Sequence, residues 1–503
     1  MRSADGAVGR SPLVRVAATP GHGETVLTAV RDAADVPVVA TGPTGIEAWE
    51  PLVLATRNGR TAFLADPEPS TARAAVETLA DGDLPTDPAD AVVEHDPDAA
   101  ALPVPDDDPL AVGRRAALAP CGWVDPVAPD DLSLAATSEW DADAVDGLLG
   151  RGRGDAVAND SVVDAWETVR ETDGKPVVVV NANEANDEPR ADRTLLAGVP
   201  LAVLDGAAAV AEHVGATDLV VYLNEADRAL ERRVRAAVDA AADALPVSPQ
   251  VVAGPNSHRA GAPTAALEAL EGADRIEPRL QPPTPAEHGL YGRPTAVHTP
   301  RTVAQVRRAL LSPAEFDSEA ADPGTRLVTV TGDVAAPATV ELPPTARLDA
   351  AREAVETDGA FKTACVGGVL GGFTRDLDLA PTADALRAAG LGTDGVLELL
   401  NEERCVVATA GERARFAAEE NSGRCVPGRE GTTQLVELLR EVYDGRVPTD
   451  EIDELGRVMA RSSNCQTGAH APRPVRTALA AFEPEFRAHA DGRCVAGTCG
   501  DSL

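Results

Sequence analysis

The alternation of apolar runs and amphipathic stretches across residues 140–315 is the feature that most constrains the fold. Residues 175–183 (KPVVVVNAN) and 217–225 (TDLVVYLNE) are typical of buried strands, with helical stretches at 201–214 and 229–245. Strands that alternate with helices form a parallel sheet, because each helix crosses over and returns the chain to start the next strand. We therefore expect an α/β domain with a parallel sheet in this part of the chain.

The segments on either side of this region predict further units of different composition. Residues 13–85 alternate strand-like and helix-like runs, which indicates a small α/β unit, and residues 86–112 are rich in Pro and Asp, which indicates an acidic linker. Residues 326–348 form a β-rich stretch with a Gly-Asp turn. Residues 382–490 are largely helical by pattern, with amphipathic segments that favour a helical bundle.

The surface is strongly acidic, which limits the partners of the chain. Asp and Glu number 81 against 45 Lys and Arg, for a formal net charge of −36, and the lysines are Lys175 and Lys362 alone. Such a surface repels itself at low salt and is tolerated when counterions screen it, so we expect a halophilic protein. The same charge argues against nucleic acid and anionic membranes as partners.

Hydropathy and cysteine usage indicate where the chain works. No apolar run reaches the ~18 residues that span a bilayer, and the N-terminal sequence MRSADGAVGRSPLVRV lacks the apolar region of a signal peptide. We therefore expect a cytoplasmic protein with no direct membrane insertion. Seven cysteines in 503 residues do not make a disulfide framework, and in a reducing compartment clustered cysteines indicate metal ligands first.

One cysteine-containing loop has the frame of an iron–sulfur site. Residues 420–431 read ENSGRCVPGREG, with Cys425 in the middle, Ser422 three residues before it and Gly428 three residues after it. Iron–sulfur loops place thiolates at such close, regular spacing because each iron takes a soft sulfur ligand. Cys465 lies further along, in SSNCQTGAHAPRPV.

This loop resembles ESCGxCxPCREG, which holds a [4Fe-4S] cluster in the NADH-binding flavoprotein subunit of respiratory complex I and in its relatives in NAD-linked hydrogenases and formate dehydrogenases. In that family all three positions are Cys, and a fourth Cys follows where Cys465 stands. Cys425 and Cys465 are therefore the metal-ligand positions that remain in this chain. A serine hydroxyl is a poor ligand because it must ionise, so we expect two buried thiols in place of a [4Fe-4S] cluster.

The resemblance covers nearly the whole chain and implies a multidomain α/β architecture in a fixed order. It implies a thioredoxin-like domain at 1–85, the acidic linker at 86–112 and a Rossmann-like domain for FMN and NADH at 113–315. A ubiquitin-like β-grasp (soluble-ligand-binding) domain at 316–375, a helical bundle with the degenerate [4Fe-4S] loop at 376–490 and a cysteine-containing tail at 491–503 complete that order.

The thioredoxin-like domain of hydrogenase-type members carries a [2Fe-2S] cluster on the signatures VCxGTGC and TGCxGxC. The corresponding segments of this chain read VAATPGH at 16–22 and TGPTGIE at 41–47. Ala17, His22, Pro43 and Glu47 take the four cysteine positions. Because a [2Fe-2S] cluster of this kind needs thiolate ligands, we expect none in this chain.

In the same family a loop GLRGRGGAGFPTGxKW wraps the FMN phosphate and the nicotinamide. The loop of this chain, GLLGRGRGDAVAND, keeps Gly150, Arg151 and Gly152, whereas Arg153 and Asp155 replace glycines. Glycine lets the backbone approach a phosphate closely, and a carboxylate beside a phosphate is unfavourable.

The strand that follows this loop keeps more of the family pattern. VVVVNANEANDEPRADR resembles VVCNADEGEPGTFKDR, with Asn181 and Glu184 matching and Asn183 in place of an Asp. Such side chains after a buried strand hydrogen-bond a flavin, although the same residue types also cap strand ends and turns. Further on, His298 and Thr299 replace two flavin-contacting Asn of the family motif PTxVNNVET. We expect the fold with weak or absent flavin binding.

A second group of cysteines predicts a different metal. His489, Cys494 and Cys499 are spaced by five residues near the C-terminus, and Cys405 lies in NEERCVVATA, which resembles the family segment CMVD. Three thiolates and an imidazole make a tetrahedral, fully coordinated zinc site, which would stabilise the fold and do no chemistry. The alternative is free thiols on a tail.

Three functions are consistent with these patterns. The resemblance implies an NADH dehydrogenase of diaphorase type, in which NADH reduces FMN and the flavin passes single electrons to an iron–sulfur acceptor. Preserved structural motifs beside altered ligand motifs favour a homologue with weakened or lost cofactor binding, which serves as a scaffold or regulatory partner of another oxidoreductase subunit. The third function is an active NADH:acceptor oxidoreductase that uses an altered FMN site without a cluster.

Overall fold

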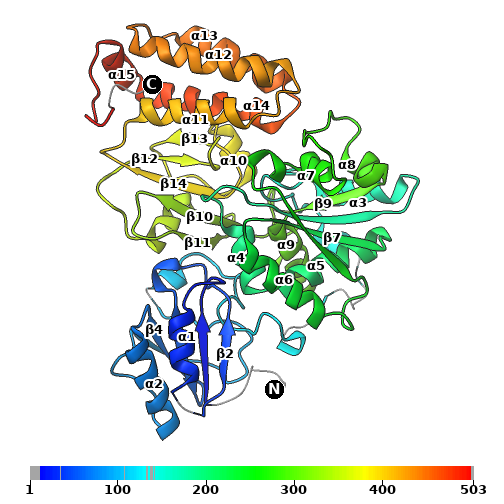
Figure 1. Cartoon of the computed structure of the whole chain (residues 1–503), viewed down its shortest axis with the longest axis vertical. Coiled ribbons are helices and arrows are strands. Elements are labelled where there is room, and N and C mark those ends of the chain that lie inside the picture. The colour runs from blue at the N-terminus through cyan, green and yellow to red at the C-terminus, as the bar shows by residue number, and fades with distance from the viewer. Residues whose placement is uncertain are drawn as a thin grey trace.

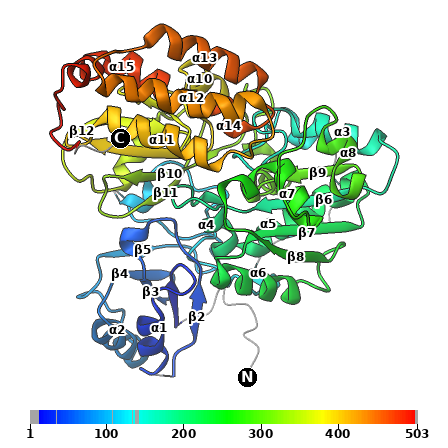
Figure 2. The ribbon, with the colours of Figure 1, turned by 45° about the horizontal axis from the view of Figure 1, so that its top comes forward.

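The structure, a computed structural model, describes residues 12–33, 35–106, 108–131, 134–135, 140 and 142–499. Within these residues the chain forms three β-sheets with helices around them, followed by a group of helices at the C-terminal end (Figure 1). The predicted mixed α/β architecture is confirmed at this level. Seen from a second direction, the N-terminal sheet, the parallel sheet and the C-terminal helices occupy separate regions of the molecule (Figure 2).

The N-terminal sheet has five strands in the order β2-β1-β3-β4-β5, with β1 parallel to β2 and the other neighbours antiparallel. Its elements are β1 (Leu13–Ala17), α1 (Glu24–Arg31), β2 (Val38–Thr41), β3 (Leu52–Arg57), β4 (Arg60–Ala65), α2 (Pro69–Asp81) and β5 (Ala91–Glu94). The predicted alternation of strands and helices is confirmed here. The range 86–112 is not purely a linker as predicted, because the short apolar run of β5 pairs with the edge strand β4.

The second sheet is parallel throughout, in the order β8-β7-β6-β9, which confirms the prediction from the strand–helix alternation. Its strands are β6 (Val177–Ala182), β7 (Asp218–Asn224), β8 (Pro249–Gly254) and β9 (Thr295–His298). The helices of this region are α3 (Val162–Glu171), α4 (Ala191–Gly198), α5 (Pro200–Val214), α6 (Arg228–Ala240), α7 (Pro263–Leu270), α8 (Pro285–His288) and α9 (Pro300–Leu311). Parallel strands bring the loops that follow β6 and β9 to the same edge, where ligands of open α/β sheets bind.

The third sheet has the order β11-β10-β14-β12-β13. Its elements are β10 (Arg326–Gly332), β11 (Ala338–Leu342), β12 (Phe361–Val366), β13 (Gly372–Thr374), α10 (Ala383–Ala388) and β14 (Val396–Asn401). The central strand β14 lies inside residues 376–490, the range predicted for the helical bundle, so that boundary was placed too early. The periodicity of a short apolar run such as VLELLN is consistent with either a buried strand or a helix. In the structure this run pairs with β10 and β12, so it is a strand.

The C-terminal helices pack on this third sheet (Figure 1). They are α11 (Val406–Glu420), α12 (Val426–Tyr443), α13 (Thr449–Ser462), α14 (Gln466–His470) and α15 (Pro472–Ala490). The clearest amphipathic segments of residues 382–490, TTQLVELLREVYDG and PVRTALAAFEPEFRAH, are predicted as helices and lie in α12 and α15, as expected. Their apolar faces form a core of their own that includes Cys365 and Phe373 of the third sheet, which ties the helices to that sheet.

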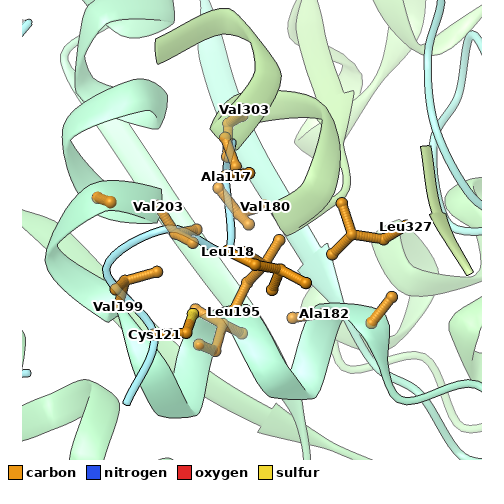
Figure 3. Close-up of a cluster of buried hydrophobic side chains, with 14 of the residues drawn as sticks. Ala117, Leu118, Cys121, Val180, Ala182, Leu195, Val199, Val203, Val303 and Leu327 are labelled. Atoms are coloured by element: carbon orange, nitrogen blue, oxygen red, sulfur yellow. The ribbon is translucent and has the colours of Figure 1, made fainter. Parts of the chain in front are cut away.

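A central core joins the first two sheets to the third. Ala117, Leu118 and Cys121, from the irregular segment before α3, pack against β6, α4, α5, α9 and β10 (Figure 3). All three side chains are buried, so this segment contributes to the hydrophobic core between the sheets. Within the described residues no single helix is long and apolar enough to cross a membrane; α4 and α5, bent by 102°, meet that test only as a pair.

Candidate functional site

The predicted cofactor-binding residues meet at the carboxyl end of the parallel sheet. Gly150, Arg151 and Gly152 lie in the loop before α3, and Asn181 lies near the end of β6. The Asn181 amide donates hydrogen bonds to the carbonyls of Gly154 at 3.0 Å and of Gly261 at 3.1 Å. The side chain therefore holds two glycine-containing loops together over the sheet, in addition to any role toward a ligand.

Asn183 and Glu184 follow β6 on the same side of the sheet. The Asn183 amide donates to the carbonyl of Pro255 at 3.1 Å. The Glu184 carboxylate accepts from the backbone N–H of Arg193 at 3.0 Å and from that of Asp192 at 3.4 Å, so it caps the start of α4. Asn181, Asn183 and Glu184 thus line one pocket, whereas the Arg151 guanidinium turns away to donate to Asp322 and to the Pro323 carbonyl.

Asp155 is fully buried between the glycine loop and the start of α9. One carboxylate oxygen accepts from the Val157 backbone N–H at 2.9 Å. The other accepts from the Thr302 hydroxyl at 2.6 Å and lies 3.2 Å from Nδ1 of His298. A carboxylate of the chain itself therefore lies beside the start of α9, held by a side-chain hydroxyl and an imidazole.

The tautomer of His298 follows from its two neighbours. Trp166 Nε1–H can only donate, and it lies 2.8 Å from Nε2 of His298, so Nε2 is the acceptor. The ring proton of a neutral His298 is then on Nδ1 and is donated to Asp155. His298 stands where the family motif has a flavin-contacting Asn. Both of its ring nitrogens are hydrogen-bonded to side chains of the protein, Trp166 and Asp155.

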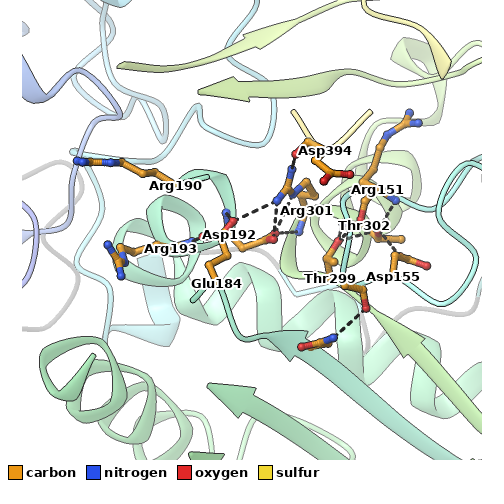
Figure 4. A network of polar contacts seen from close by, with 12 residues as sticks. Arg151, Asp155, Glu184, Arg190, Asp192, Arg193, Thr299, Arg301, Thr302 and Asp394 are labelled. Atoms are coloured by element: carbon orange, nitrogen blue, oxygen red, sulfur yellow. Dashed lines mark hydrogen bonds and ion pairs between the residues drawn. The ribbon is translucent and has the colours of Figure 1, made fainter. Parts of the chain in front are cut away.

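Arg301 forms a buried ionic network beside this site (Figure 4). Its guanidinium donates to both carboxylate oxygens of Asp192, at 3.1 and 2.7 Å, to Glu184 at 3.1 Å and to the carbonyl of Asp394 at 2.6 Å. Burial raises the pKa of Glu184 to about 7 and the charge of Asp192 adds to this rise, against the lowering effect of Arg301. The Arg301 side chain fills the space next to Gly152, where a built Cβ would lie 2.9 Å from its Cζ.

A pocket opens between this network and the third sheet, and we call it the inter-sheet pocket. About 530 Å³ without protein atoms lies in and above this pocket, part of it open to solvent. Polar lining residues include Arg153, Asn181, Asn183, Glu184, His258 and Asp394. Burial lowers the pKa of Arg153 to about 10 and lowers the pKa of His258 well below its usual range. The inter-sheet pocket therefore combines a cation, carboxylates and a neutral imidazole.

A single carboxylate joins the two N-terminal loops that resemble cluster-binding segments. Glu50 accepts from the backbone N–H of Thr19 at 3.1 Å and from that of Thr44 at 2.7 Å. The hydroxyls of the same two threonines donate to Glu50 at 3.2 Å each. Burial raises the pKa of Glu50 to about 7, partly offset by the hydrogen bonds from Thr44. The Glu50 side chain thus connects the loops of residues 16–22 and 41–47 by hydrogen bonds.

In the bundle, Cys425 and Cys465 lie at the N-terminal ends of α12 and α14. The Sγ of Cys425 accepts from the backbone N–H groups of Gly428 and Asn464, at 3.4 Å each. A Cβ built on Gly428 would lie 3.0 Å from the Cys425 Sγ and 3.9 Å from the Cys465 Sγ, and one built on Gly468 would lie 2.9 Å from the Gly428 Cα. The backbones of Gly428 and Gly468 therefore approach each other closely beside the two thiols.

The ligand atoms of Cys405, His489, Cys494 and Cys499 all lie within 4.8 Å of one another, so this group could hold a metal ion. His489 Nε2 lies 3.3 Å from the Cys405 Sγ and 3.4 Å from the Cys499 Sγ. His489 Nδ1 lies 2.8 Å from the carbonyl of Glu485, to which it donates. Because Nδ1 carries the proton, Nε2 has a lone pair that can bind a metal ion. Histidine ligands of metals are commonly oriented by such a hydrogen bond from the other ring nitrogen.

Comparison with known proteins identifies the family. Residues 147–308 match the Nuo51 FMN-binding domain, and residues 408–489 match the NADH-ubiquinone oxidoreductase-F iron-sulfur binding region. The chain is 32% identical to the F subunit of the NADH-quinone oxidoreductase of Streptomyces coelicolor, over 76% of this chain and 86% of that protein. It is 27% identical to NADP-reducing hydrogenase subunit HndC of Solidesulfovibrio fructosivorans, over 76% and 85%.

The chain therefore belongs to the NADH-quinone oxidoreductase-F family, as its motifs predicted. A solved structure of an NAD+-reducing [NiFe]-hydrogenase in the H2-reduced state superimposes with a TM-score of 0.66 at 24% identity, covering 95% of this chain and 84% of the hydrogenase chain. That likeness shows a shared fold.

Sequence reasoning overlooked three residues that define the inter-sheet pocket. Arg301 stands where the family motif PTxVNNVET has Glu, so a reversal of charge was visible in the sequence. His258 and Asp394 carry no local motif signal. They reach the pocket from segments more than 100 residues apart, and such a meeting depends on how the sheets pack.

The raised pKa of Glu50 predicts a pH-dependent stability. Its folded-state pKa of about 7 exceeds the ordinary value of 4.5, so its contribution is complete below about pH 4.5 and is lost as the pH rises through about 7. The difference in unfolding free energy between the wild type and Glu50→Gln should decrease by about 2 kcal/mol between pH 5 and pH 8, since one pKa unit is worth about 1.4 kcal/mol.

Calorimetric melting across this pH range measures that difference. Glu68→Gln, an exposed position of the same N-terminal unit, is the matched control and should follow the wild-type profile. Parallel profiles for the wild type and Glu50→Gln would contradict the prediction.

Proposed function

We propose that this member of the oxidoreductase-F family serves as a scaffold or regulatory partner of another oxidoreductase subunit, with the family's flavin binding weakened or lost. The buried carboxylate of Asp155 is the observation that carries the proposal. It receives hydrogen bonds from Val157, His298 and Thr302 at the start of α9. An FMN phosphate on the glycine loop would have to displace Asp155 or lie against its charge.

The other residues of the flavin region also support weakened or lost flavin binding. Arg301 fills the space beside Gly152, and its charge is neutralised by Asp192 and Glu184. A buried arginine with its donors used in this way offers little to an incoming phosphate. These contacts do not suit FMN in the manner implied by the family motifs, which supports the proposal of weakened flavin binding.

The iron–sulfur positions support the proposal independently. Two thiols remain of four family cysteines, and the backbones of Gly428 and Gly468 approach each other beside them. At the N-terminal loops, Glu50 takes hydrogen bonds from both segments that correspond to [2Fe-2S] ligand loops. Neither donor set fits a cluster that requires soft thiolate ligands at every iron.

The partner is inferred from the relatives. Both relatives named above are themselves named as subunits of oxidoreductases, and we propose that this chain likewise assembles with an oxidoreductase subunit. As part of the same proposal we place it in the cytoplasm, where its thiols would stay reduced.

We further propose that Cys405, His489, Cys494 and Cys499 hold a structural zinc ion. Three sulfurs and one imidazole nitrogen match a closed tetrahedral site, which leaves no open position for catalysis. The ion would join the start of α11, the end of α15 and the segment that follows α15. Zinc bound in this way contributes its binding free energy to folding.

The flavin proposal is tested by FMN titration of the wild type and of Asp155→Gly. The wild-type protein should purify without the ~450 nm absorbance of a bound flavin and should bind added FMN weakly. Asp155→Gly restores a glycine and removes the negative charge, so it should bind FMN at least about tenfold more tightly, equivalent to about 1.4 kcal/mol. Quenching of FMN fluorescence gives both dissociation constants.

Asp160→Asn, which changes an exposed acid close to the same loop, is the control for a general effect of charge. A yellow wild-type protein that oxidises NADH would overturn the proposal in favour of an active oxidoreductase with an altered FMN site. The preserved Asn181 and Glu184 are the observations that favour that alternative. High salt is needed during purification because of the net charge of −36.

The zinc proposal predicts stoichiometric zinc by elemental analysis. Cys494→Ser should lose the metal and lower the apparent melting temperature by roughly 5 °C, because a lost metal site removes folding free energy. Cys465→Ser, a thiol of the same bundle outside the group, should keep the metal. A metal-free wild type that melts at the same temperature with and without added zinc would contradict the proposal.

A further inference from the structure

The fold of the C-terminal bundle brings together two thiols that have no role in the zinc group. Cys425 precedes α12 and Cys465 precedes α14, so the two cysteines are about 40 residues apart in the chain. Cys425 is buried and Cys465 is half-buried. Neither belongs to the four-residue group for which we propose zinc.

Both sulfurs border the space that a side chain on Gly428 would occupy. A Cβ built on this glycine would lie 3.0 Å from the Cys425 Sγ and 3.9 Å from the Cys465 Sγ. The Cys425 Sγ also accepts from the backbone N–H of Asn464, the residue before Cys465, at 3.4 Å. The Cys425 side chain is therefore held next to the segment that carries Cys465.

The electrostatics of Cys465 agree with this placement. Burial is the main cause that raises the pKa of the Cys465 thiol, and the Gly468 N–H opposes the rise. The Cys425 side chain raises the same pKa further, by its charge and by a hydrogen bond between the two thiols. The side chains are thus in contact as well as neighbours of one glycine.

The surroundings of the pair favour covalent chemistry over metal binding. Among the described residues, no third ligand atom from His, Cys, Asp or Glu joins the two sulfurs in a group that could hold a metal ion. A disulfide needs only the two sulfurs. The difference in exposure also orders the reaction, because a reagent reaches the half-buried Cys465 before the buried Cys425.

We propose that Cys425 and Cys465 are a modification site, at which exchange with a small-molecule disulfide such as oxidised glutathione forms a reversible disulfide bond. The Cys465 thiolate attacks one sulfur of the reagent, whose S–S bond breaks, and one glutathione leaves and takes up a proton. The Cys425 thiolate then attacks the Cys465 sulfur of this mixed disulfide, and the second glutathione leaves in the same way. Two protein thiols are oxidised by two electrons, and one glutathione disulfide is reduced to two thiols.

The disulfide would change the stability of the bundle. It closes a loop of about 40 residues that contains α12 and α13. Such a cross-link restricts the unfolded chain, so the oxidised bundle is more stable than the reduced one. This inference rests on the proposed function in one respect, because an iron–sulfur cluster on Cys425 and Cys465 would occupy both sulfurs.

Peptide mapping of the full chain tests the pairing. The protein is treated with oxidised glutathione in high salt with added zinc, and free thiols are alkylated in denaturant before digestion with trypsin. The peptides of residues 425–429 and 462–476, which carry the two cysteines, should be recovered linked to each other and should separate with dithiothreitol. Linked species that contain the fully buried Cys121 or Cys365 should be at least about tenfold rarer.

Melting temperatures test the stabilisation. The oxidised wild type should melt roughly 5 °C above the reduced wild type, because the cross-link restricts the unfolded bundle. Cys425→Ser and Cys465→Ser each leave one thiol of the pair, so oxidation should not raise their melting temperatures. Cys365→Ala, which removes a buried thiol outside the pair, is the matched control and should gain as much as the wild type. Where a variant folds poorly, the peptide map of the wild type decides.

Recovery of Cys425 and Cys465 as unlinked thiols, or as separate glutathione adducts that do not pair, would overturn the inference. Equal melting temperatures of the oxidised and the reduced wild type would overturn it too. Iron analysis of the same preparation separates the two proposals. A brown, iron-containing protein contradicts the proposed function, whereas an iron-free protein whose two thiols stay unpaired contradicts this inference alone.

Discussion

The buried guanidinium of Arg301 is the interaction on which the arrangement of the sheets depends. It binds Asp192 at the start of α4, Glu184 after β6 and the Asp394 carbonyl before β14, so one side chain connects the parallel sheet to the third sheet. Desolvating such a charge is costly, and removing one partner of a buried pair typically costs about 3 to 5 kcal/mol. The network therefore tolerates little rearrangement, and it fixes where the inter-sheet pocket opens.

The same principle recurs at the positions where the family motifs place electron carriers. Buried donors need acceptors, and in this chain the acceptors belong to the protein. Glu50 takes the N–H groups of the two N-terminal loops, and Asp155 takes the hydroxyl and imidazole donors at the start of α9. In the bundle, the backbones of Gly428 and Gly468 approach each other beside the Cys425 and Cys465 thiols. At the first two positions, groups of the protein itself satisfy the buried donors.

Much of the fold could be predicted from the sequence, because its strongest patterns are local. The strand–helix alternation predicted the parallel sheet, and the amphipathic segments predicted α12 and α15. The errors occurred at short apolar runs. β5 was included in a linker, and β14 was included in the helical bundle, because four to six apolar residues do not by themselves distinguish a strand from a helix or a loop. In the structure, β5 and β14 are strands because each pairs with a strand from elsewhere in the chain.

The sequence by itself determined the family and the loss of cysteine ligands, since motif order and residue identity are properties of the chain alone. It also marked Asn181, Asn183 and Glu184 as neighbours of one site. Only the tertiary structure decided what those residues contact, and only it brought Arg153, His258 and Asp394 to a common pocket. The physical reason is that hydrogen bonds and ion pairs between distant segments depend on the packing of whole sheets, and local sequence carries no record of that packing.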